Sequence, residues 1–552
     1  MAPERIGDRL RSVRRHALAT LLATTALGVV AAHAVDGTWT GVSSDWTDPA
    51  NWSSNPSVPD GTATFTNTGS ASVDNFNGVV VIGTVLFTNT AQAYTVTIGD
   101  AFIVNGTGII NNSGNTQNFI STSNGINMVF QNSSTASGGT GAVTITNNSG
   151  GTVSFLQNST AGTASIINGS FLTFEDSANA GSAQITNNAG GQIDFYTSAS
   201  AGSATINNAA SATLSFHNNT TAATSSIIND GTVNFDGSAT AGSATITTNN
   251  GATTNFSASA TGGNAKFITN AGGTVDISGL TSGGMTSGSI EGAGNYVLGA
   301  NTLTTGSLNT STQVDGIISG TGGGLTKVGT GTLTLTNLNS YTGATTISAG
   351  TLAISGFGSI SSSSVVTVDA TFDISGSSVP FNAITTLAGS SSGVVNMGGN
   401  GLVITNGSTE FAGVIQGTGG LEVFGGTQTL SGANSYGGPT QIDAGGTLAL
   451  KGSGSIANSL YVGFNAGGTL DISQTTSGAS VGGLFSLFLG NVALGSKTLT
   501  ITSGSVFAGV IQDGGIGGGT GGNLVIANGA LQQLAGINTY TCLLYTSDAA
   551  DE

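Results

Sequence analysis

Short apolar stretches recur along the chain with a fixed period. Between residues 142 and 280, a large apolar residue returns every 19 or 21 residues at each of two positions. The first position holds Ile145, Ile166, Ile185, Ile206, Ile227, Ile246 and Phe267, and the second holds Phe155, Phe174, Phe195, Phe216, Phe235, Phe256 and Ile277. A short Ile strand, a Gly/Asn turn and a short Phe strand therefore repeat about every 20 residues.

A unit of this length cannot bury its own apolar face, so successive units must stack. The pattern predicts an all-β fold, a right-handed parallel β-helix (solenoid) in which equivalent Phe residues lie about 4.8 Å apart. We expect roughly 25 coils and a length of roughly 120 Å. The change from 21 to 19 residues should fall in a turn, because an even change keeps each strand residue on its own face.

An asparagine row accompanies the apolar rows. Asn147, Asn168, Asn187, Asn208 and Asn229 each follow an Ile by two residues. Stacked coils would place these amides above one another, where they can hydrogen-bond to each other and to the turn backbone. We therefore expect a side-chain ladder along the axis.

The segment 35–60 differs from the repeats and is predicted to form an N-terminal cap. Trp39, Trp46 and Trp52 cluster there with three prolines, and between residues 60 and 541 only Pro380 and Pro439 occur. A cap over the first open coil protects a solenoid from aggregation. The three tryptophans are also candidate surface contacts, since indole rings can stack on carbohydrate.

Both ends of the chain are set apart from the fold prediction. Residues 1–34 have the basic start, apolar run and Ala32-His33-Ala34 site of a secretory signal peptide. Residues 542–552 break the composition, contain the one cysteine, and resemble the translation of a transposase sequencing adapter. We expect an exported protein whose native sequence in this chain stops at Thr541.

Composition removes several function classes. Only 6% of residues are charged, the formal net charge is −17, and no arginine follows residue 15. We therefore predict that the protein does not bind nucleic acid, because such binding relies on Lys and Arg side chains. Residues 35–541 contain no cysteine, so disulfides, thiolate metal sites and cysteine nucleophiles are excluded as well. We predict neither a cofactor nor a metal.

Candidate catalytic groups are few. His217 is the one histidine after residue 34, and it follows Phe216 at a variable, outward position where other coils carry Tyr196, Asp236 or Ser257. Asp276, Asp373 and Asp471 each lie in an Asp-Ile-Ser motif between apolar residues, which predicts a solvent-facing carboxylate. Enzymes with this fold need clustered carboxylates or a basic residue. We predict no catalytic residue, and a polysaccharide-acting lyase or hydrolase remains the alternative.

A longer motif begins at residue 315. It contains Gly324-Leu-Thr-Lys-Val-Gly and Thr332-Leu-Thr-Leu, then Asn339-Ser-Tyr-Thr-Gly-Ala-Thr-Thr-Ile, and it returns around Phe411 and Asn434 and again from Phe507. This motif resembles the autotransporter-associated β-strand repeat, and the second copy lacks the lysine. We divide the chain into 61–314 with coils of about 20 residues, and 315–541 with these repeats, the third cut short.

The resemblance implies a passenger region carried to the surface of a Gram-negative bacterium. In that family a C-terminal transmembrane β-barrel normally supplies the outer-membrane anchor, and no segment here has that pattern. The prediction is a non-enzymatic stalk or adhesive surface, located at the cell surface, in the outer membrane or outside the cell. Its expected partners are glycans or proteins of a host or the environment, or sister molecules.

Overall fold

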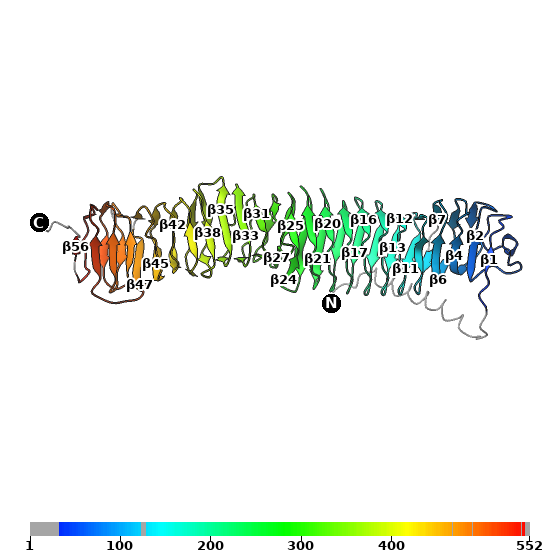
Figure 1. Cartoon of the computed structure of the whole chain (residues 1–552), viewed down its shortest axis with the longest axis horizontal. Coiled ribbons are helices and arrows are strands. Elements are labelled where there is room, and N and C mark those ends of the chain that lie inside the picture. Colours follow the sequence, from blue (N-terminus) through cyan, green and yellow to red (C-terminus); the bar gives the residue numbers. More distant parts are fainter. Residues whose placement is uncertain (1–32, 123–127, 466, 488, 543, 547–552) are drawn as a thin grey trace, which may run out of the picture.

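The chain winds into a long parallel β-helix. The computed structural model describes residues 33–122, 128–465, 467–487, 489–542 and 544–546. Figure 1 shows the coils stacked along one axis, with β1 and β2 near one end and β56 at the other. The all-β parallel solenoid predicted from the period is confirmed, with about 22 turns. The turns are fewer than predicted because the early coils are longer, as in the pairing of Val85 with Ile109 and of Met128 with Val153.

Two long sheets form the N-terminal half, and we name them by their buried rows. The Phe sheet contains β1 Gly37–Thr38, β2 Thr62–Phe65, β4 Val80–Phe87, β6 Phe102–Asn111, β8 Met128–Phe130, β9 Thr135–Gly139, β11 Thr152–Phe155, β13 Phe171–Phe174, β15 Gln192–Phe195, β17 Thr213–Phe216, β19 Thr232–Phe235, β21 Thr253–Ala258, β23 Thr274–Leu280, β26 Asn295–Val297 and β29 Ile318–Ser319. The Ile sheet contains β3 Ser72–Asp74, β5 Thr95–Ile98, β7 Gln117–Ser121, β10 Val143–Asn147, β12 Ser165–Asn168, β14 Gln184–Asn187, β16 Thr205–Asn208, β18 Ser226–Asn229, β20 Thr245–Thr248, β22 Lys266–Thr269 and β25 Ser289–Glu291.

Shorter sheets form the C-terminal half. The first pair comprises β24 Gly284–Ser287, β27 Thr302–Thr305, β30 Gly324–Lys327, β32 Thr345–Ile347, β34 Val366–Val368 and β37 Leu387–Ala388, and β28 Thr312–Val314, β31 Thr332–Leu335, β33 Thr351–Gly356, β35 Thr371–Ser377, β38 Val394–Asn396 and β41 Val414–Gln416. The second pair comprises β36 Phe381–Ile384, β39 Gly401–Ile404, β42 Leu421–Val423, β44 Thr440–Ile442, β46 Val462–Phe464 and β49 Leu484–Phe485, and β40 Glu410–Phe411, β43 Gly426–Leu430, β45 Gly446–Gly452, β47 Thr469–Thr475, β50 Asn491–Ala493 and β53 Val510–Gln512. The last sheets comprise β48 Ala479–Val481, β51 Thr498–Ile501, β54 Asn523–Ile526 and β56 Leu544–Thr546, and β52 Val506–Phe507 with β55 Gln533–Leu534.

The interior is a dry stack of aligned side chains. The rings of Phe130, Phe155, Phe174, Phe195, Phe216, Phe235 and Phe256 are at most 1% exposed. Consecutive rings lie 4.7–4.8 Å apart at interplanar angles of 5–9°. This distance equals the spacing between neighbouring strands, so each ring contacts the equivalent ring of the next coil. The predicted Phe row is confirmed.

The asparagine ladder is also present and buried. Asn147 donates through Nδ2 to Oδ1 of Asn168 at 2.7 Å, and the same contact continues through Asn187 and Asn208 to Asn229. Spare amide hydrogens go to backbone carbonyls such as that of Thr213. From Asn168 to Asn229, each amide oxygen of the ladder therefore accepts a hydrogen bond from the preceding asparagine.

The change in coil length lies in one turn, as predicted. Gly169 and Ser170 alone separate β12 from β13, whereas Asn188 to Gly191 separate β14 from β15. The strands on both sides stay in register, with Ile166 opposite Ile185 and Phe174 opposite Phe195.

A third short face closes each coil. Isolated parallel bridges link Thr160, Asn179, Ser200, Thr221, Thr240 and Thr261 in that order. In each coil this side chain accepts a hydrogen bond from the amide two residues later, as Ser200 Oγ does from Gly202. Gly202 has a φ of +59°. The recurrent Ala-Gly-Ser-Ala sequence is thus a tight corner, with a glycine at a left-handed position and buried alanines on either side.

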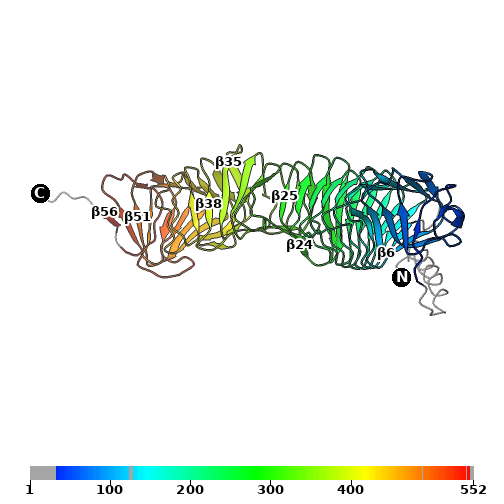
Figure 2. The same cartoon turned by 45° about the vertical axis from the view of Figure 1, so that its right-hand side comes forward.

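New sheets begin at three similar places along the solenoid. A register shift occurs where β21 pairs with β23, β33 with β35, and β45 with β47. The strands β23, β35 and β47 carry Asp276, Asp373 and Asp471 respectively. A new sheet begins with β24, β36 or β48 directly after each of these strands. The solenoid is therefore segmented, and Figure 2 shows the coils continuing across the segments.

Among the described residues, no helix is long and apolar enough to cross a membrane. The predicted signal peptide lies almost wholly outside the described residues.

Candidate functional site

The three tryptophans of the N-terminal segment form part of the core, which corrects their prediction as surface contacts. Trp39 and Trp46 are fully buried and Trp52 is 2% exposed. Trp52 packs edge-to-face against Trp39, Trp46 and Phe65, and Trp39 and Trp46 lie tilted against Phe65, with centroids 5.0–5.8 Å apart. Indole rings sealed in this way cannot stack on a sugar. Burying such large apolar rings favours the interior strongly, and their clustering in the sequence reflects that packing.

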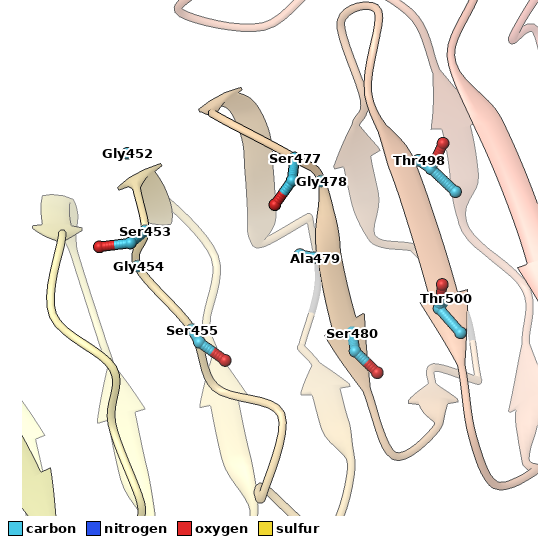
Figure 3. Close-up of a pocket in the computed structure, with 10 residues that line it drawn as sticks. All are labelled: Gly452, Ser453, Gly454, Ser455, Ser477, Gly478, Ala479, Ser480, Thr498 and Thr500. Carbon is cyan, nitrogen blue, oxygen red and sulfur yellow. The ribbon is translucent and has the colours of Figure 1, made fainter.

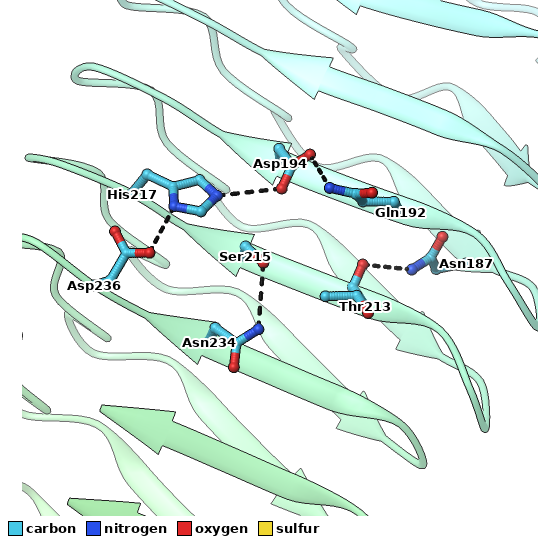
Figure 4. A network of polar contacts seen from close by, with 8 residues as sticks. All are labelled: Asn187, Gln192, Asp194, Thr213, Ser215, His217, Asn234 and Asp236. Atoms are coloured by element: carbon cyan, nitrogen blue, oxygen red, sulfur yellow. Dashed lines mark hydrogen bonds and ion pairs between the residues drawn. The ribbon is translucent and has the colours of Figure 1, made fainter. Parts of the chain in front are cut away.

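A charged cluster lies on the outer face of the Phe sheet. His217 Nδ1 lies 2.7 Å from Asp236 Oδ2, and its Nε2 lies 3.2 Å from Asp194 Oδ1. The three side chains come from consecutive coils, following β17, following β19 and within β15 (Figure 4). Tyr196 stacks on the imidazole with ring centroids 4.7 Å apart, and Gln192 donates to Asp194 at 2.6 Å. We call Asp194, His217 and Asp236 the histidine cluster.

The histidine cluster favours a protonated ring. Burial lowers the pKa of His217, but the hydrogen bonds to Asp194 and Asp236 and their negative charges outweigh it and raise the pKa to about 9. The imidazole is then a cation near neutral pH, with both nitrogens held by carboxylates. A ring in this state cannot accept a proton, so it does not act as a general base.

Sequence reasoning placed His217 correctly on the outer face but expected it to face solvent. Its side chain is 19% exposed, because the neighbouring coils cover it. The equivalent positions noted in the sequence, Tyr196 and Asp236, are its contacts. Asp194 was missed, and its signal was the strand register, which sets Asp194 opposite Ser215, two residues before His217.

The Asp-Ile-Ser motifs act on the backbone. Asp276, Asp373 and Asp471 each accept a hydrogen bond from the amide of the serine two residues later, at 2.8–2.9 Å. Such Asx turns stabilise the irregular backbone at the register shifts. The carboxylates thus have a structural partner in every copy.

Asp471 is buried, which corrects its prediction as solvent-facing. It is 2% exposed, and its Oδ2 accepts a hydrogen bond from the amide of Ile516 at 2.7 Å. The glycine-rich segment 513–522 folds back over it, and Gly517 donates to Ser473 Oγ at 2.8 Å. Asp276 and Asp373 remain partly exposed. Within the described residues, no group of three or more His, Cys, Asp or Glu side chains could hold a metal ion.

The long repeat motif supplies polar clamps inside the coils. Asn339, Asn434 and Asn538 each accept through Oδ1 from an amide one coil earlier, those of Ile318, Ile415 and Ile511, at 2.9–3.0 Å. The hydroxyls of Tyr341 and Tyr436 contact Thr345 and Thr440 at 2.7 Å. Burial raises the pKa of both tyrosines far above its ordinary value. These motif residues therefore hold coils together.

Lys327 has the same kind of role in the first copy. It is 1% exposed, and its Nζ donates to the carbonyls of Val328, Gly329 and Ala349 at 2.7, 2.9 and 3.3 Å. Burial lowers its pKa. The second copy has Val423 at this place, also buried.

Comparison with known proteins agrees with these repeats. A family model described as passenger-associated-transport-repeat matches residues 325–354 and 425–450. Over 240 residues, the chain is 35% identical to a protein named adhesin BmaC autotransporter from Brucella suis biovar 1 (strain 1330). The match covers 40% of this chain and 7% of the relative, so the chain spans a small part of that protein's length. No solved structure matches the chain.

Proposed function

We propose that this chain, which belongs through its passenger-associated transport repeats to the family of autotransporter passenger regions, is an exported, non-enzymatic passenger that presents a rigid adhesive surface outside the cell. A continuous solenoid suits this role because each coil contacts its neighbours along the whole axis. The adhesin name of the Brucella relative supports adhesion as the activity.

The proposal rests on one observation: the reactive side chains already have hydrogen-bond partners within the fold. Both ring nitrogens of His217 face carboxylates, and Lys327 Nζ faces three carbonyls. The buried hydroxyls of Tyr341 and Tyr436 are paired with threonines. Groups with their hydrogen-bonding capacity used inside the fold serve stability, which leaves the outer face for contact.

Outward positions of the Phe sheet are rich in hydroxyl and amide groups, such as those of Ser154, Thr173, Asn234 and Asn255. Thr173 donates to Ser154 at 2.9 Å, and Asn255 donates to Asn234 at 3.0 Å, each across one coil. Such rows present regularly spaced donors and acceptors. We propose that they contact glycans, proteins or sister molecules at a surface.

Display of the chain on a Gram-negative cell tests adhesion. Cells that display it through a heterologous anchor should be retained on cultured host cells or on immobilised extracellular glycans and proteins. The matched control displays the variant Phe195→Asp, which puts a charge into the dry Phe row and should disrupt the coils. Equal retention of both strains would contradict the proposed function.

A polysaccharide panel tests the absence of catalysis. The purified chain should release no product, because both ring nitrogens of His217 are already held by carboxylates. Turnover that is lost in Asp194→Asn or Asp236→Asn would replace the adhesive proposal with an enzymatic one.

A further inference from the structure

A groove opens where the last segment of the solenoid begins. It has a volume of about 340 Å³ and is lined by Gly452 to Ser455, by Ser477 to Ser480, and by Thr498 and Thr500. Figure 3 shows Gly452 to Ser455 on one side of Ala479 and Ser480, and Thr498 and Thr500 on the other. The groove therefore extends from the preceding coil across β48 to β51.

β48 is an edge strand on the groove side. It is the first strand of its sheet, where it pairs with β51. The amide of Thr502 donates to the carbonyl of Val481 at 3.0 Å, so the backbone groups of Val481 face β51. Successive residues of a strand direct their amide and carbonyl to opposite edges. The amide and carbonyl of Ser480 therefore face the groove.

The lining favours one kind of occupant. It consists of glycine, alanine, serine and threonine, with no charge and no aromatic ring among its described residues. An ionic ligand would find no counter-charge there, and a sugar ring would find no aromatic platform. An exposed strand edge instead binds an extended backbone, because main-chain hydrogen bonds supply the affinity.

We infer that this groove binds an extended polypeptide segment with small, uncharged side chains, which adds to β48 as an extra strand. The segment would hydrogen-bond to the amide and carbonyl of Ser480. This inference deepens the proposed function by naming the chemistry of one partner, and it rests on that function only for the biological setting.

The same arrangement recurs at the first segment boundary. A groove of about 380 Å³ lies beside β24 and is lined by Thr261, Ser282 to Thr286, Thr302 and Thr304. The amide of Thr302 donates to the carbonyl of Gly283 at 3.0 Å, so Gly284 and Thr286 face the other edge. The carbonyl of Thr286 already lies against Gly262 of the preceding coil, so the edge of β24 is less open than that of β48.

Peptide binding to the purified full chain tests the inference. The probe is a fluorescein-labelled peptide that copies residues 198–205, in which every residue is Ala, Gly, Ser or Thr. Ser480→Pro removes the amide that faces the groove and leaves the ladder to β51 intact. Its dissociation constant for the probe should rise by about tenfold, the loss expected for one hydrogen bond with altered edge geometry.

Ser480→Ala is the matched control. It removes the hydroxyl but keeps the backbone groups, so the dissociation constant should stay unchanged. A probe with N-methyl groups on alternate residues should fail to bind the wild-type chain, which keeps the test valid even if Ser480→Pro folds poorly by circular dichroism. Equal binding of the plain and N-methylated probes would overturn the inference.

Competition by a sugar distinguishes a peptide ligand from a carbohydrate ligand. Maltoheptaose should not compete with the probe peptide. Competition that Ser480→Ala abolishes would show that the groove recognises sugar hydroxyls, and the inference would be wrong. If the peptide does not bind in solution but the displaying cells still adhere, the inference alone is refuted. If the peptide binds but the cells do not adhere, the proposed function alone is refuted.

Discussion

At the residue scale, the contacts of a polar side chain depend on the residues near the equivalent position one coil away. His217 has no charged residue within ten positions of it in the sequence, yet stacking sets it between Asp194 and Asp236. Lys327 finds a carbonyl acceptor in Ala349 of the next coil. Sequence position alone therefore does not reveal what a polar group contacts in a solenoid.

The titration of His217 tests the histidine cluster. We expect NMR to give a pKa of about 9 for this imidazole, because two carboxylates stabilise its charged form. Since the folded pKa lies above the ordinary value of about 6.5, the added stability is complete below that pH and disappears as the pH rises through about 9.

Asp236→Asn supplies the comparison for that titration. It keeps an acceptor oxygen beside Nδ1 but removes a charge, so the pKa should fall toward 6.5. His217→Gln identifies the resonance. A wild-type pKa near 6.5 would mean that the carboxylates do not hold the ring.

Lys327→Val tests the carbonyl clamp in the first long repeat. The substitution copies Val423 of the second repeat, but it leaves the carbonyls of Val328, Gly329 and Ala349 without their donor. We expect the free energy of local opening to fall by about 1–3 kcal/mol. Hydrogen exchange of the amides in residues 325–354 measures it.

Lys266→Val is the matched control for the lysine test. Lys266 forms a partly exposed ion pair with Glu291, at 2.8 Å. Its loss should change local stability by less than about 1 kcal/mol. Similar effects of the two substitutions would argue against a special role for Lys327.

At the scale of strands and turns, the sequence predicts what repeats and misses what does not. The Phe and Asn rows were predictable because they keep a fixed phase, and a strand tolerates no odd shift of its faces. The burial of Trp39, Trp46 and Trp52 was not, since one copy of a segment has no period to assign its inward face. Asp471 was misassigned because the loop that buries it, residues 513–522, is absent from the other copies.

The segment boundaries were hidden for another reason. Asp276, Asp373 and Asp471 recur visibly, but their bulges depend on how two coils pair. A register shift between strands leaves no mark in either strand alone. The grooves beside β24 and β48 follow from these shifts and could not be predicted from the sequence.

Engineered disulfides test the register of the strands. Thr186 of β14 and Asn207 of β16 are register partners with outward side chains. Cysteines at both positions should form an intramolecular disulfide under mild oxidation, because adjacent strands lie within the permitted Cα separation of about 4.4–6.8 Å.

The disulfide test uses a pair offset by one residue as its control. Cysteines at Thr186 and Asn208 should remain reduced, since Asn208 points into the interior. Both double variants carry Cys542→Ser to remove the free thiol. Equal oxidation of the two pairs would show that neighbouring coils lack a fixed register.

At the scale of the whole molecule, the contacts between neighbouring coils add up to one stiff rod. Each coil contacts its neighbours through sheets, a Phe stack and an Asn ladder, so bending would open several rows at once. The early tryptophan cluster packs against Phe65 of β2, near the start of the Phe sheet. Such a rod holds its surface away from the point at which it is attached.

Small-angle X-ray scattering of the chain in solution tests the central claim most directly. About 22 turns at about 4.8 Å each predict a rod roughly 105 Å long, whose radius of gyration is at least about 30 Å. A compact globule of 552 residues would instead have a radius of gyration of about 24 Å. A rod-like scattering profile of that length is the predicted result, and a globular or fully expanded profile would contradict the stacked, dry interior.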